Sequence, residues 1–201
     1  MKAPFGTATR SDLWLAVALA AAVIVGTAID AARRVVEILP NRDVPVEVYF
    51  ESQQQAIAIT GLSEPVRADL DHATIRVSDL APASYVSAIA AVVVPALAVI
   101  GVMVCISWLC RNLAGSVFFS RTNTRLVTAT SLLIVGGWML SSLARTMASN
   151  GALATVSPEA ADVSVTMQFS LMYLFIAIIV GSLAAAFHAG ERMQRDAEGL
   201  V

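Results

Sequence analysis

The sequence predicts an all-α transmembrane four-helix bundle with a small extracytoplasmic β-element between the first two helices. Four apolar runs approach the ~20 residues that a helix needs to cross ~30 Å of hydrocarbon. Between the first two runs, roughly forty residues alternate between apolar and polar side chains with the period of a strand. The composition agrees, because 57% of the 201 residues are hydrophobic and only 14% are charged.

One membrane domain is expected over residues 1–201, beginning with an uncleaved helix. The first apolar run is longer than the core of a secretory signal, and its helical pattern continues past Ile29 until Pro40. Pro95 predicts a kink in the second helix. The expected spans cover about residues 13–39, 84–111, 124–147 and 167–191.

Residues 40–83 form the predicted β-rich insertion. Val44, Val46, Val48 and Phe50 alternate with polar or breaking residues, and two further short strands are expected at Ala56–Thr60 and Ala73–Val77. Two to four strands are too few to bury a core alone. We therefore expect the insertion to pack against the outer helix ends or against a copy of itself.

The distribution of charge predicts how the chain is oriented. Residues 30–83 hold nine acidic groups and five arginines, whereas the connection from Arg111 to Arg125 holds three arginines and no acid. Because short basic loops stay in the cytoplasm, the loop 110–125, the tail 190–201 and both termini are expected there. The location predicted for this multi-pass protein is a bacterial cytoplasmic (inner) membrane.

The sequence favours a function other than catalysis. A net charge of -2 gives no basic field for direct nucleic-acid binding, and no motif for a catalytic nucleophile or metalloprotease is present. His188 and Glu191 stand three residues apart without the further ligands of a metal site. We expect no enzyme activity, no catalytic or metal-binding residues and no cofactor.

Two stretches resemble a known family. Residues 115–126 read Gly-Ser-Val-Phe-Phe-Ser-Arg-Thr-Asn-Thr-Arg-Leu, and residues 187–201 end in Asp-Ala-Glu-Gly-Leu-Val. Both are similar to signatures of an uncharacterised family of bacterial membrane proteins catalogued as domain of unknown function 2975. The resemblance implies four spans with a β-rich outside segment, and a partnership with a small helix-turn-helix regulator of the Xre type.

The hypothesis that follows is a signalling or interaction partner of a cytoplasmic regulator, which docks on the loop and the tail. Ser120 and Asn123 are expected to cap the third helix. An arginine rim also anchors any helix to lipid headgroups, and that alternative stays open. The expected partner-binding residues are Arg111, Ser120, Arg121, Asn123, Arg125, Glu191, Arg192, Asp196 and Glu198.

A second hypothesis is a small oligomeric transporter, pore or immunity-type membrane protein. Small residues recur at Ala18, Ala22 and Gly26 in the first helix, and at Ser182, Ala186 and Gly190 in the fourth. Such spacing lets helix backbones approach closely. The two faces are expected to pack on each other or to form a homo-oligomer.

Overall fold

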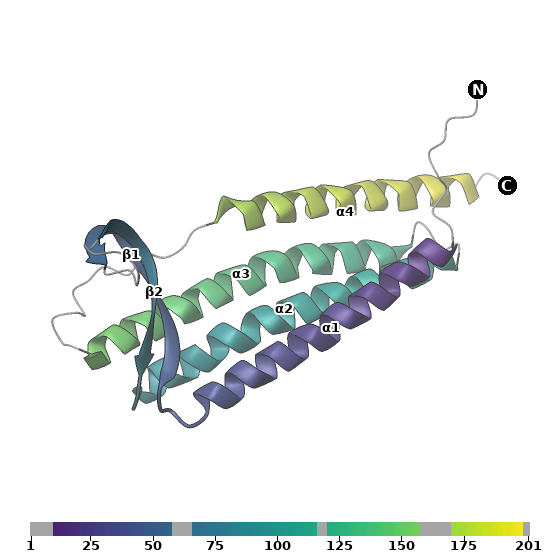
Figure 1. Cartoon of the computed structure of the whole chain (residues 1–201). Helices are drawn as coiled ribbons and strands as arrows, with labels where there is room; N and C mark the ends of the chain where they lie inside the picture. Colours follow the sequence, from purple (N-terminus) through teal and green to yellow (C-terminus); the bar gives the residue numbers. More distant parts are fainter. Residues whose placement is uncertain (1–9, 58–65, 116–119, 157–169, 199–201) are drawn as a thin grey trace. The chain divides into compact units, whose positions relative to one another are not determined.

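The computed structural model describes residues 10–57, 66–115, 120–156 and 170–198. Within them, four helices and one pair of strands follow each other in the order α1, β1, β2, α2, α3, α4 (Figure 1). Each helix is long and apolar enough to cross a membrane, which indicates a multi-pass membrane protein. The elements are α1 (Arg10–Ile38), β1 (Val44–Ile57), β2 (Val66–Val77), α2 (Pro82–Ala114), α3 (Arg121–Val156) and α4 (Leu171–Glu198).

The helix ends differ most from expectation in α3. This helix continues to Val156, beyond the end at residue 147 that the sequence predicts. Asn150 and Gly151 favour a loop by themselves. The helix continues through them because Ala152 and Leu153 are buried in a hydrophobic core. Packing therefore overrides local preference at this end.

The chain divides into two compact units. The first, here called the four-helix unit, consists of Met1–Ala31, Pro95–Trp138 and Ser170–Val201. The second, here called the hairpin unit, consists of Ala32–Val94 and Met139–Phe169.

In the four-helix unit, α2 and α3 approach closely at glycines. A Cβ atom on Gly101 would lie 2.9 Å from Cδ1 of Leu133, and a Cβ atom on Gly137 would overlap the Cβ atom of Ala98. The neighbouring Gly136 has no such contact within 4 Å. The overlap at Gly137 requires a residue without a side chain, as is common where membrane helices cross, whereas at Gly101 the flexible side chain of Leu133 could shift.

The contact between α3 and α4 uses a different face of α4 from the predicted one. The hydroxyl of Ser131 donates a hydrogen bond of 2.9 Å to the carbonyl of Ala177, which is buried together with Ala184. Of the predicted face, Ser182 and Ala186 are exposed and Gly190 is buried. On α1, the small-residue face is also exposed, and Gly26 has no neighbour within 4 Å of an added Cβ atom. The two predicted faces therefore do not pack on each other within the described residues.

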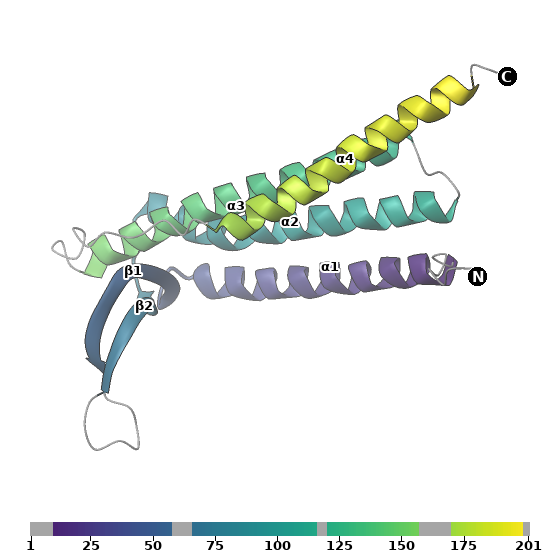
Figure 2. The same cartoon turned by 90° about the horizontal axis from the view of Figure 1, so that it is seen from above.

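In the hairpin unit, β1 and β2 form a two-stranded antiparallel sheet (Figure 2). Its register pairs Val44 with Val77, and the pairing is interrupted between Tyr49 and Gln53. Two strands confirm the predicted small β-element, although β1 is longer than the alternating pattern indicates. The predicted strand Ala56–Thr60 lies partly outside the described residues.

The inward face of the hairpin packs on helix ends. Val44, Val46 and Val48 are buried, as the alternation predicts, and each points to the same side of the sheet. They share one core with residues of α2 and α3. This core contains Ile38, Val44, Val46, Val48, Val77, Leu80, Ala88, Ala148, Ala152 and Leu153. The hairpin thus acquires from the helices the core that two strands cannot build alone.

The two junctions between hairpin and helices are tied together through Asn41. Its side chain donates to the carbonyl of Leu80 at 3.2 Å and accepts from the N–H of Leu80 at 3.1 Å. Asn41 has a φ of 50°, a left-handed conformation that asparagine adopts more readily than most residues. The hydroxyl of Tyr85 adds a hydrogen bond of 3.2 Å to the carbonyl of Leu39. These hydrogen bonds fix the positions at which the chain passes from α1 into the hairpin and from the hairpin into α2.

Ser149 of α3 gives a testable link between hairpin and helix. Its hydroxyl, in a residue only 1% exposed, donates a hydrogen bond of 2.6 Å to the carbonyl of Glu47. Ser149→Ala is expected to lower the free energy of unfolding by about 0.5–1.5 kcal/mol, the usual net contribution of a hydrogen bond, because the carbonyl of Glu47 loses its donor. Unfolding in dodecyl sulfate micelles measures this. The exposed Asn150 is the matched control, and equal effects of Ser149→Ala and Asn150→Ala would contradict the assignment.

Candidate functional site

Ser120 caps the first turn of α3. Its hydroxyl accepts a hydrogen bond of 3.2 Å from the N–H of Asn123, and its carbonyl accepts one of 3.0 Å from the N–H of Thr124. A serine in this position satisfies an N–H group that the helix itself leaves without a partner. The predicted cap is therefore confirmed for Ser120, whereas Asn123 has another role.

Asn123 joins α3 to α2. It is fully buried, and its side-chain oxygen accepts a hydrogen bond of 2.7 Å from the side-chain amide of Asn112 in the last turn of α2. Buried amides need such partners. Asn123 therefore positions the backbone around it and presents no side chain to a partner. The expectation that it contacts a partner directly does not fit this burial.

An ion pair brings the start of α3 to α4. Nε of Arg121 lies 3.2 Å from Oε1 of Glu191, and both a hydrogen bond and a salt bridge are formed. The carboxylate side chain is 12% exposed and the arginine 71% exposed. So exposed an arginine adds little stability. The contact is informative because it brings together the loop and the tail, which lie 70 residues apart in sequence.

Three further predicted residues are arginines, of which Arg125 lies one turn after Arg121 on α3 and Arg192 follows Glu191 on α4. Arg111, Arg125 and Arg192 are all exposed. We call Arg121, Arg125, Glu191 and Arg192 the loop-end surface. The side chains of Asp196 and Glu198, although these residues belong to α4, lie outside the described ones. Guanidinium groups in such a cluster recognise carboxylate or phosphate groups in a partner.

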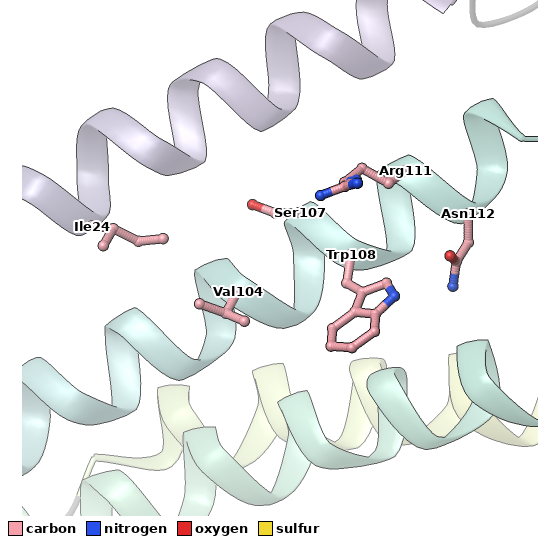
Figure 3. A pocket seen from close by; sticks show the side chains of 6 residues that line it. All are labelled: Ile24, Val104, Ser107, Trp108, Arg111 and Asn112. Atoms are coloured by element: carbon pink, nitrogen blue, oxygen red, sulfur yellow. The ribbon is translucent and has the colours of Figure 1, made fainter.

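A hollow of about 500 Å³ lies beside the last turns of α2 (Figure 3). Its lining combines apolar side chains with one arginine. In Figure 3, Ser107 and Arg111 point into the space between α1 and α2, where Ile24 of α1 also points. The lining residues are Ile24, Val104, Ser107, Trp108, Arg111 and Asn112.

The sequence did not single out Asn112 or Trp108. Tryptophan near a helix end is common at a membrane interface. Their role here depends on the crossing of α2 with its neighbours, which periodicity does not encode. Among the described residues, no three His, Cys, Asp or Glu side chains gather to hold a metal ion. Glu191 pairs with Arg121, and His188 is exposed.

A family model described as Protein of unknown function (DUF2975) matches residues 61–201. The chain belongs to this family. Both stretches that carry the resemblance, residues 115–126 and 187–201, lie within the matched range. No curated protein and no solved structure is similar enough to match the chain. Membership in DUF2975 thus identifies the family and leaves the function to be argued from the molecule.

Proposed function

We propose that this DUF2975 chain is a non-enzymatic membrane protein that binds a cytoplasmic helix-turn-helix regulator at its loop-end surface. The observation that supports this most directly is the contact between Arg121 and Glu191. It joins the two stretches that characterise the family resemblance, so that loop and tail present one surface. Arg125 and Arg192 are exposed on the same unit and supply the charge.

The orientation is part of the proposal. Three arginines without an acid in residues 111–125 favour the cytoplasmic side, because short basic loops are retained there. The bacterial inner membrane then holds the four helices, with both termini inside. The hairpin unit is placed outside, where it senses a ligand, a peptide or the state of the envelope and passes the signal along the helices.

Affinity purification of the intact chain from its native membranes tests the proposal. A small helix-turn-helix protein is expected to accompany the chain, identified by mass spectrometry. Arg125→Gln and Arg192→Gln are each expected to lower the recovery of this regulator, and the double variant is expected to lower it about tenfold. The reason is that charge complementarity steers and holds such complexes. Both positions are exposed, so the fold should be retained.

The matched control is Arg33→Gln, which removes an exposed arginine from the hairpin unit. It should leave recovery of the regulator unchanged. A truncation after Met193 preserves Glu191 and removes the end of the tail, and it should also reduce recovery. The proposal fails if the regulator is absent, or if it is recovered equally with all these variants.

The second hypothesis, an oligomeric transporter or pore, is favoured by one observation. The small-residue face of α1, with Ala18, Ala22 and Gly26, is exposed and available to a second copy. Against a path through the unit, Gly101 packs on Leu133, and the hydroxyl of Ser131 is bonded to α4. A defined oligomer that is purified without a regulator and conducts solute in liposomes would favour this hypothesis.

A further inference from the structure

The hollow beside α2 has features that the proposed function does not use. About 500 Å³ lies within the range of about 300–1,000 Å³ that small-molecule sites occupy. Its walls come from α1 and α2, and it is apolar except for Ser107, Arg111 and Asn112. A ligand that fits this hollow must have both an apolar part and an anionic group.

We propose that this hollow holds one anionic phospholipid, with its phosphate against Arg111 and an acyl chain along Val104 and Ile24. This goes beyond the proposed function and does not depend on it. It also assigns Arg111 to a lipid rather than to the protein partner.

The polar side of the hollow carries one charge that needs a counterion. Ser107 and Arg111 are four residues apart and share a face of α2. The hydroxyl of Ser107 donates to the carbonyl of Met103 at 2.8 Å, and the amide of Asn112 donates to Asn123. No hydrogen bond or ion pair joins the guanidinium of Arg111 to any residue that the structure describes. Its five donors suit phosphate oxygens.

The apolar side has the character of a surface that meets acyl chains. Val104 is 45% exposed and Trp108 is 56% exposed, in a helix with the length and composition of a membrane span. Such exposure is expected where lipid rather than protein covers a helix. Arg111 follows Val104 by seven residues, about 10 Å along the helix axis. A chain on Val104 and a phosphate at Arg111 therefore match the two ends of one lipid.

The position along α2 agrees with a headgroup. Arg111 lies three residues before Ala114, the last residue of the helix. Three residues correspond to about 5 Å along the helix axis. Trp108, one turn earlier, is a residue type enriched at the level of the headgroups. A lipid with a net negative headgroup is favoured over a zwitterionic one, because a choline group would bring a second cation towards Arg111.

The test uses the purified full chain in mild detergent, titrated with phosphatidylglycerol or with phosphatidylcholine of the same chain length. Native mass spectrometry counts the bound molecules. One phosphatidylglycerol is expected to bind at concentrations where phosphatidylcholine does not. Arg111→Gln should weaken that binding about tenfold, equivalent to about 1.4 kcal/mol, since a charge-assisted contact with the phosphate is lost. Inorganic phosphate should not displace the lipid.

The matched control is Arg192→Gln, which removes an exposed arginine away from the hollow. It should retain phosphatidylglycerol and recover less of the protein partner, whereas Arg111→Gln should bind less phosphatidylglycerol and recover the partner normally. Because the two variants have opposite expected outcomes, failure of the lipid site can be distinguished from failure of the proposed function. Equal binding of both lipids, equal binding by Arg111→Gln and Arg192→Gln, or displacement by phosphate alone would overturn the proposal. Size-exclusion chromatography and circular dichroism verify that each variant is folded.

Discussion

Gly137→Ala is expected to lower the free energy of unfolding by about 1–3 kcal/mol, the usual range when a packed contact is overfilled. The added Cβ atom would overlap the Cβ atom of Ala98 across the crossing of α2 and α3. Neither atom belongs to a flexible side chain, so the clash is relieved only if the helices move apart. The midpoint of unfolding in dodecyl sulfate micelles, followed by circular dichroism, measures the loss.

Gly136→Ala is the matched control, because nothing lies within 4 Å of a Cβ atom at that position. Both substitutions gain the same helix propensity, up to about 1 kcal/mol, so their difference isolates the contact. Ala98→Gly, combined with Gly137→Ala, should restore the space and much of the stability. Equal midpoints for the two single variants, or no rescue by Ala98→Gly, would contradict the close crossing.

Asn123→Ala is expected to lower the free energy of unfolding by about 1–3 kcal/mol, because it leaves the amide of Asn112 without its partner. The two amides are 2.7 Å apart, and Asn123 is fully buried. Any loss of partner binding in this variant would therefore follow from a displaced helix start. For this reason the exposed arginines are better probes of the partner than Asn123.

A double-mutant cycle measures the pair directly. Asn112→Ala and Asn123→Ala together should lower stability by less than the sum of the single variants, with a coupling of about 0.5–3 kcal/mol. The exposed Thr122 serves as control, and Thr122→Ala should change stability by less than about 0.5 kcal/mol. Additive single variants would show that the two amides do not stabilise each other.

The four helices could be predicted because length and hydropathy alone identify a membrane-spanning helix. The residues at which the helices end could not be predicted, because they depend on tertiary contacts. α3 continues through Gly151 because Ala152 and Leu153 are buried beyond it. A Cβ atom on Gly151 would overlap the side chain of Ser84, so α2 and α3 are closely packed at that level. A glycine that would signal a helix end in isolation here permits a crossing.

The strands show the same division. Val44, Val46 and Val48 alternate, and their burial follows directly from that period. The end of β1 contains Gln53, Gln54 and Gln55, which carry no alternation, and it pairs with β2 nonetheless. Backbone hydrogen bonding to a neighbouring strand is enough to extend a strand whose own side-chain pattern does not predict it.

The loop and the tail were recognisable from sequence, but their contacts were not. Arg121 and Glu191 have no spacing that would relate them, because 70 residues separate them. On α4, several stripes of small residues are compatible with helical periodicity, and only the packing selects Ala177 and Ala184 over Ser182 and Ala186. A pairing between helices depends on their rotation, which composition leaves free.

The bond from Ser149 to Glu47 has a consequence for how the protein is made. The two residues are separated by 102 positions. At a synthesis rate of about 5–20 residues per second, roughly 5–20 s pass between the appearance of the hairpin and that of its partner in α3. Throughout that interval Val44, Val46 and Val48 lack Ala148 and Ala152, which complete their core. The hairpin is an early product of translation and a late product of folding.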